Sequence, residues 1–187
     1  MDDRLFFSAT QRNKAAIGDV LATYLPDSGT ILEIASGSGE HGVSFQTRFP
    51  NINWQTSECN PTYRKSISAW INYQGLSAKM EQPLDLDVEK KPWPLTSKLR
   101  TTLNGIVCIN MIHISPWSCT KSLIHEASII LKMDQFLILY GPFKRNNKHT
   151  SYSNLQFDTS LKCQNPTWGV RNLEEVCELA TKNGFKY

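Results

Sequence analysis

Hydrophobic positions along this chain switch repeatedly between a helical spacing and short apolar runs. Helical spacing bounded by glycine or proline predicts helices over 11–25, 39–49, 61–74, 116–131 and 172–184. Apolar or alternating runs predict strands over 30–35, 52–57, 83–87, 104–111 and 136–140, and 185–187 reads as the start of another. The stretches 90–100 and 141–169 are predicted to be loops. This exchange of strands and helices predicts an α/β fold with a mainly parallel sheet and helices on both faces.

Glycine or polar residues stand at the carboxyl ends of the predicted strands. In a parallel sheet these ends share one edge, where a ligand crevice opens at the point where the strand order reverses. The positions concerned are Gly37, Gly39, Glu58, Asp87 and Asn110. We therefore expect these residues to meet at a single ligand site.

Residues 31–42, ILEIASGSGEHG, predict a strand, a glycine turn and a helix start. Gly37 and Gly39 allow the backbone to bend sharply and to approach a ligand. The spacing Gly37-x-Gly39-x-x-Gly42 matches the dinucleotide fingerprint, and Glu58 follows Gly39 by 19 residues, near the spacing of a ribose-binding acid. An NAD(P)-dependent oxidoreductase is therefore one alternative.

Glu33 favours a different cofactor. A carboxylate within an apolar strand is costly unless it is paired, and it would lie unfavourably close to a pyrophosphate. S-adenosylmethionine carries a sulfonium and an ammonium group and no phosphate. Glu58 suits its two ribose hydroxyls, and Asp87 could accept a hydrogen bond from the adenine amino group. Three carboxylates along one cationic molecule favour S-adenosylmethionine.

Composition restricts the other classes. A chain of 187 residues predicts one domain, 1–187, and a net charge of +3 is too weak to indicate nucleic acid. No apolar window is long enough to predict a membrane span, and residues 1–7 lack the apolar core of a signal peptide. The five cysteines are widely spaced without a CxxC pair, which indicates reduced thiols and no metal site. We expect a cytoplasmic protein whose acceptor is a small molecule or a protein side chain; the oligomeric state stays open.

Six segments of the sequence carry a family resemblance: 11–14, 32–41, 86–88, 108–116, 140–143 and 165–171. Together they resemble the methyltransferase-like protein 26 family, a branch of the class I S-adenosylmethionine-dependent methyltransferases. The resemblance implies a Rossmann-like three-layer sandwich whose chain continues past Tyr187 through a final strand hairpin. It implies cofactor contacts at Glu33, Gly37, Gly39, Glu58, Asp87 and Asn110. It also implies that the first helix covers the methionine end of the cofactor, where Asn13 could reach the carboxylate and Lys14 could complement its charge.

Candidates for catalysis are fewer. The ordinary pKa of histidine lies near physiological pH, so His41 and His113 are each either a general base or a hydrogen-bonded structural residue. His113 is the stronger candidate because it follows the strand where substrates of this fold meet the methyl group. Tyr140 ends the next predicted strand and would form part of the wall of the acceptor pocket. The basic run 144–149 is interpreted either as a solvated loop or as a segment that attracts an acidic acceptor.

These observations predict an S-adenosylmethionine-dependent methyltransferase acting by direct displacement on an unidentified acceptor. A non-catalytic cofactor-binding or interaction protein on the same scaffold is the other alternative.

Overall fold

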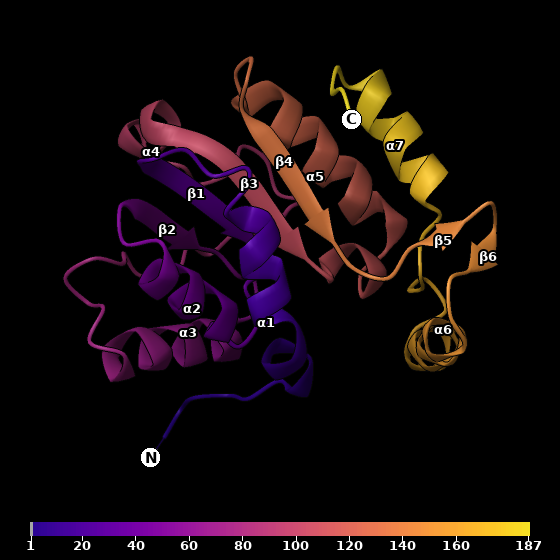
Figure 1. Ribbon diagram of the computed structural model, residues 1–187, viewed down its shortest axis with the longest axis horizontal. Helices are drawn as coiled ribbons and strands as arrows, with labels where there is room; N and C mark the ends of the chain where they lie inside the picture. The colour runs from indigo at the N-terminus through magenta and orange to yellow at the C-terminus, as the bar shows by residue number, and fades with distance from the viewer. Residues whose placement is uncertain (1) are drawn as a thin grey trace.

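Four parallel strands form the main sheet of the computed structural model, which describes residues 2–187 (Figure 1). The strands are β1 (Gly29–Ile34), β2 (Ile52–Thr56), β3 (Leu103–Ile109) and β4 (Phe136–Tyr140). Their order is β2-β1-β3-β4, so the chain winds outward in one direction from β1 and in the other from β3. The predicted α/β fold and parallel sheet are confirmed, and the strand order reverses between β1 and β3.

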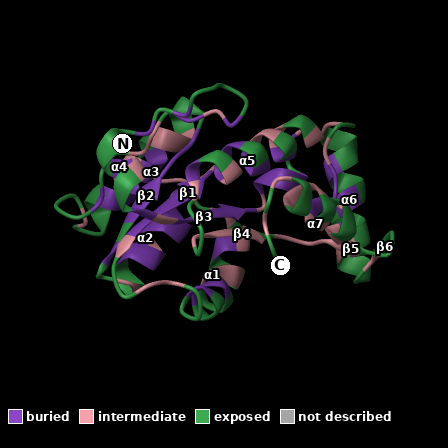
Figure 2. Ribbon diagram, turned by 90° about the horizontal axis from the view of Figure 1, so that it is seen from above, coloured by how far each residue is buried: buried purple, intermediate pink, exposed green. Residues whose placement is uncertain are grey.

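Helices cover both faces of the sheet. On one face lie α1 (Ser8–Leu21), α2 (Glu40–Arg48) and α3 (Pro61–Tyr73), packed on the side chains of Ile31 and Val107. On the other lie α4 (Ser97–Thr102), α5 (Trp117–Ile130) and α7 (Leu173–Lys182), packed on Leu32 and Ile106. Neighbouring strand residues thus point to opposite faces and both are buried, as the apolar runs predict. Figure 2 shows the buried strands between the two helical layers.

The prediction of a loop over 141–169 is wrong. This stretch forms the two-stranded hairpin β5 (Lys144–Arg145) and β6 (Lys148–His149), followed by α6 (Tyr152–Gln164). Asn146 and Asn147 form the turn with φ values of 50° and 61°, which Asn tolerates better than most residues. Only Asp158 and Leu161 of α6 are buried, so the helix has no apolar stripe for a sequence pattern to detect.

Three smaller predictions are also wrong. Residues 83–87 make only one bridge to the sheet, Leu84 with Ser57, because Pro83 has no N–H to extend the pairing. The expected loop 90–100 contains the start of α4, where the Thr96 hydroxyl accepts the Leu99 N–H. Residues 185–187 form no strand. None of the helices described over residues 2–187 is both long enough and apolar enough to span a membrane.

Candidate active site

Two strained turns lie side by side where β1 and β3 end. The turn after β1 holds Ala35, Gly37 and Gly39 at φ values of 54°, 57° and 93°, and Asn110 after β3 has φ 64°. A left-handed backbone costs a non-glycine residue about 1–2 kcal/mol, so the surrounding structure must hold Ala35 and Asn110 in place. Sequence patterns find the two glycines and Asn110, whereas nothing in the sequence singles out Ala35. Because such strain gathers at ligand sites, this edge is the candidate active site.

Glu58 ties the glycine turn to the segment after β2. One carboxylate oxygen accepts the Gly37 N–H at 3.1 Å, and the other accepts the Asn60 N–H at 3.0 Å. The oxygen that accepts the Asn60 N–H also accepts the Cys59 thiol at 3.5 Å, a weak donor that a hydroxyl can displace. A carboxylate oxygen accepts about two hydrogen bonds, so the oxygen bound to Gly37 keeps capacity for one more. Glu58 therefore combines a fixed position with room for two hydroxyl donors.

Asp87 lies near Glu58, on the loop that follows the isolated bridge. Its Oδ1 accepts the Glu89 N–H at 3.0 Å, and its Oδ2 lies 3.6 Å from the Nζ of the exposed Lys90. The exposed Asp85 is paired with Arg64 at 2.9 Å. Burial raises the pKa of the Cys59 thiol, and the nearby carboxylates of Glu58 and Asp87 raise it further. The carboxylates of Glu58 and Asp87 therefore both lie close to the Cys59 thiol. Within residues 2–187, no group of three or more His, Cys, Asp or Glu side chains could hold a metal ion.

Glu33 lies beneath the glycine turn, on the side of the sheet that faces α2. Its side chain is buried, and Oε2 accepts the indole N–H of Trp54 at 3.1 Å. No Lys, Arg or His among residues 2–187 forms an ion pair with it. Burial raises the pKa of Glu33 to about 7, and the charge of Glu58 adds to the effect. Strand β1 thus contains a buried carboxylate that no cationic side chain of residues 2–187 neutralises.

Glu40, at the start of α2, is a functional candidate that sequence reasoning missed. It is buried, and its Oε2 accepts the Phe7 N–H at 2.9 Å while the Gln11 amide donates to Oε1 at 2.5 Å. The Phe7 ring in turn lies over the turn, since a Cβ added at Gly37 would be 3.1 Å from it. Glu40 stands next to the predicted glycines, but a partner 33 positions away leaves no local signal.

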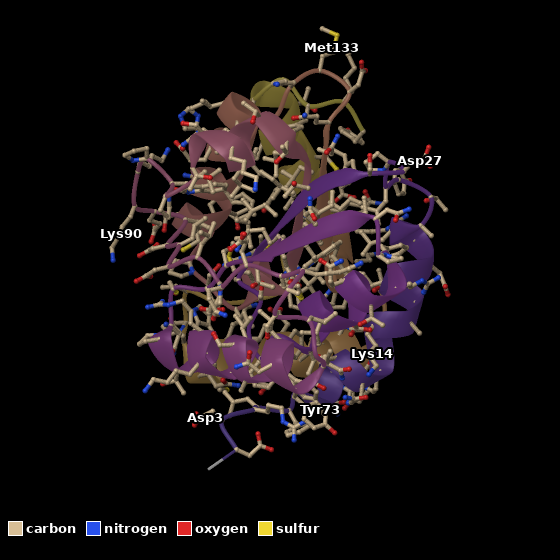
Figure 3. All side chains as sticks on the ribbon, turned by 90° about the vertical axis from the view of Figure 1, so that its left-hand side faces the viewer. Asp3, Lys14, Asp27, Tyr73, Lys90 and Met133 are labelled. Carbon is tan, nitrogen blue, oxygen red and sulfur yellow. The ribbon has the colours of Figure 1, made fainter. Side chains whose placement is uncertain are left out.

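Asn13 projects from α1 toward the start of α2. Its Oδ1 lies 2.9 Å from His41 Nε2, which leaves the amide NH₂ without a bond to the described residues. Burial lowers the pKa of His41 to about 4, and Lys14 adds to this, so the imidazole is neutral. Lys14 lines a groove of about 580 Å³ that Tyr73 also lines, and Figure 3 shows both side chains at the same edge of the molecule.

His113 is buried completely in the turn after β3. Its Nδ1 accepts the Arg171 N–H at 3.3 Å, and its Nε2 has no partner among residues 2–187. Burial lowers the pKa of His113 to about 4, with a further contribution from Arg171. Only glycine fits at position 141, because a Cβ there would lie 2.3 Å from His113 Nε2. The close packing of Gly141 on His113 fixes the end of β4, where Tyr140 is partly exposed.

The fold is similar to that of solved methyltransferase structures. The structure superimposes on an O-methyltransferase family protein from Burkholderia thailandensis with a TM-score of 0.74 and 15% identity, covering 95% of this chain and 52% of that one. An O-methyltransferase family 2 protein from Planctomyces limnophilus, in complex with apigenin, gives 0.74 and 17%, covering 96% and 54%. Human N-acetylserotonin methyltransferase in complex with S-adenosylmethionine gives 0.71 and 11%, covering 95% and 47%. At such identities the likeness establishes the fold alone, and the chain spans about half the length of these proteins.

The family is established by sequence. Residues 4–187 match the model of a family described as protein of unknown function, DUF938, and the chain belongs to that family.

Proposed function

We propose that this chain binds S-adenosylmethionine between the two strained turns and transfers its methyl group to an acceptor at the carboxyl ends of β3 and β4. The arrangement of acids around the glycine turn carries the proposal. Glu58 occupies the Gly37 N–H, and the buried Glu40 occupies the first turn of α2. These are the two places where a dinucleotide's pyrophosphate would bind, so the chain's own carboxylates disfavour an anionic cofactor and favour a cationic one.

Each residue has a role that follows from its position. Glu58 keeps acceptor capacity for the two ribose hydroxyls, and Asp87 stands close enough to accept from the adenine amino group. Buried Glu33, when ionised, supplies a negative field under the turn, and a ligand with a positive charge favours this ionised form. The free NH₂ of Asn13 would donate to the ligand carboxylate, and the glycine turn and Asn110 would bring their backbone close to the ligand.

When bound, S-adenosylmethionine supplies an electrophilic methyl group on a sulfonium. This chain's contribution is orientation and exclusion of water, for which Phe7 over the turn and Tyr140 at the end of β4 are placed. His113 is buried and neutral, so we assign it to positioning the end of β4 rather than to proton transfer. No acidic or basic group need react covalently.

Two finer assignments accompany this proposal. We propose that the chain belongs to the methyltransferase-like protein 26 family, which the six segments resemble, and that it acts in the cytoplasm. Solved structures with this fold are named as O-methyltransferases, which makes a hydroxyl the first acceptor chemistry to examine.

Calorimetric titration of the purified chain with S-adenosylmethionine and with its demethylated product tests the proposal. We expect saturable binding of both, and we expect Asp87→Asn to weaken it by about tenfold, the effect of one lost charge-assisted hydrogen bond. Asp85→Asn is the matched control, because Asp85 is two residues away and is paired with Arg64. A folded chain that binds neither compound refutes the proposal, and saturable binding of NADH instead establishes the oxidoreductase alternative.

Transfer of a labelled methyl group to components of a cell lysate then separates an enzyme from a binding protein. Binding without any transfer would favour the non-catalytic alternative.

A further inference from the structure

The hairpin β5–β6 and helix α6 carry the net positive charge of the whole chain. Residues 144–164 contain four Lys and Arg and one Asp, a net charge of +3. The remaining residues contain 16 Lys and Arg and 16 Asp and Glu, so the rest of the chain is neutral. We call residues 144–164 the basic platform.

One buried carboxylate organises this platform without neutralising it. Asp158 Oδ2 lies 3.2 Å from Lys144 Nζ, 2.9 Å from His149 Nε2 and 2.8 Å from Lys162 Nζ. Its Oδ1 accepts the Val170 N–H at 2.8 Å. Although burial opposes it, these contacts, led by Lys162, hold the pKa of Asp158 well below its usual range. A single negative charge therefore fixes two ammonium groups and an imidazole, and positive charge remains in excess.

Two further cations are left uncompensated at the tip of the hairpin. Arg145 and Lys148 are exposed and directly opposite each other across the hairpin. Neither forms an ion pair with any residue of the range 2–187, and the adjacent Glu174 is bound to the Asn146 N–H at 3.1 Å. Like charges that face each other across a strand pair destabilise it, and an anion placed between them removes the repulsion.

The platform also exposes apolar side chains. Tyr152 is 73% exposed and Leu155 43% exposed, and Lys162 follows them at helical spacing on the same side of α6. Figure 2 shows α6 as a largely exposed helix. A surface that combines cations with an aliphatic side chain fits a polypeptide carrying acidic and apolar residues.

The platform adjoins the end of the sheet where the acceptor would bind. The Phe143 ring, just before β5, packs edge-on against His113 with centroids 5.0 Å apart, and Lys144 N–H donates to the Arg171 carbonyl at 2.9 Å. Figure 1 shows β5, β6 and α6 beyond the carboxyl end of β4. We infer that the basic platform docks an acidic polypeptide segment and presents its side chain for methylation. This inference rests on the proposed function.

A nucleic acid is the less favoured partner. The four cations of the platform are fewer than the roughly six to ten phosphate contacts with which a protein neutralises a nucleic-acid backbone.

Fluorescence anisotropy with a labelled copolymer of Glu and Tyr tests the inference. The copolymer should bind at low salt and release as salt rises, and the Arg145→Glu, Lys148→Glu double variant should bind at least about tenfold more weakly. This double variant keeps the facing pair alike in charge, so the hairpin should be no less stable. Lys79→Glu with Lys98→Glu is the matched control, since both residues are exposed and lie near the amino ends of β2 and β3. Tyr152→Ser with Leu155→Ser should also weaken binding.

The inference fails if the copolymer does not bind, if the platform and control variants bind it equally, or if single-stranded oligouridylate binds more tightly. Measuring S-adenosylmethionine binding by the same variants separates the two proposals. If the natural chain binds S-adenosylmethionine but not the copolymer, the platform alone is refuted. If the natural chain binds the copolymer but not S-adenosylmethionine, the proposed function alone is refuted.

Discussion

Replacing the buried Glu33 by Gln should change how the stability of the fold depends on pH. Burial raises the pKa of Glu33 to about 7 in the folded chain, against 4.5 for an ordinary glutamate. The folded state therefore holds this proton more tightly than the unfolded state. Its contribution to stability is fully present below pH 4.5 and is lost as pH rises through about 7.

The magnitude follows from the two pKa values. A difference of one pKa unit between the folded and unfolded states corresponds to about 1.4 kcal/mol. Raising the pKa of Glu33 from 4.5 to about 7 therefore lowers the free energy of unfolding by about 3 kcal/mol above pH 7, where Glu33 is ionised. Glu33→Gln keeps an oxygen to accept the Trp54 N–H and removes the charge. We expect this variant to be more stable than the natural chain by about 1–3 kcal/mol at pH 8, the lower bound allowing for an unpaired amide hydrogen, and by much less at pH 5.

Urea denaturation from pH 5 to pH 8.5 measures this difference directly. Glu81→Gln is the control, because Glu81 is exposed and its substitution should leave the pH dependence unchanged. The neutral buried histidines affect both proteins alike and cancel in the comparison. Parallel stability curves for Glu33→Gln and the natural chain would refute the raised pKa of Glu33 and the cost of its ionisation in the folded state.

Two further substitutions test the packing around the carboxyl edge. Gly141→Ala should lower the free energy of unfolding by about 1–3 kcal/mol, because the new Cβ would meet His113 Nε2 at 2.3 Å; an unchanged denaturation midpoint would show that the imidazole is not confined there. Lys148→Glu should raise the free energy of unfolding by about 0.2–1 kcal/mol, since it converts the repulsive pair with Arg145 into an attractive one; thermal denaturation at low and high salt measures this, and a gain that persists at high salt would contradict the electrostatic cause.

The sheet could be predicted from the sequence because its signals are local. Each of β1, β2, β3 and β4 is a short run of apolar or alternating residues bounded by glycine, proline or polar residues. Burial on both faces makes most positions of β1 and β3 apolar. Helix α6 could not be predicted, because only two of its positions are buried and it is held by Asp158 through ion pairs. Residues 83–87 have the right composition for a strand but can form only one bridge.

The site residues likewise fall into those that the sequence reveals and those that only the folded chain reveals. Gly37, Gly39, Glu58 and Asn110 are visible in the sequence because each lies at or just after the end of a predicted strand. The contacts of Glu40 with Phe7 and of His113 with Arg171 join residues 33 and 58 positions apart, so only the folded chain reveals them. His113 also shows how a titratable side chain after a strand can be buried, neutral and structural.

The choice of cofactor depends on residues that the glycine spacing does not contain. Gly37-x-Gly39-x-x-Gly42 fits a dinucleotide, yet the position directly after Gly39 is Glu40, a buried acidic residue at the start of α2 that would repel a phosphate there. Glu58 accepts the Gly37 N–H, which a phosphate would otherwise take. An anion would have to displace Glu58 and would be repelled by Glu40, whereas a cation would be attracted by both acidic residues and by Glu33 beneath. The same glycine turn can therefore serve opposite ligand charges, and the acidic side chains around it decide which one binds.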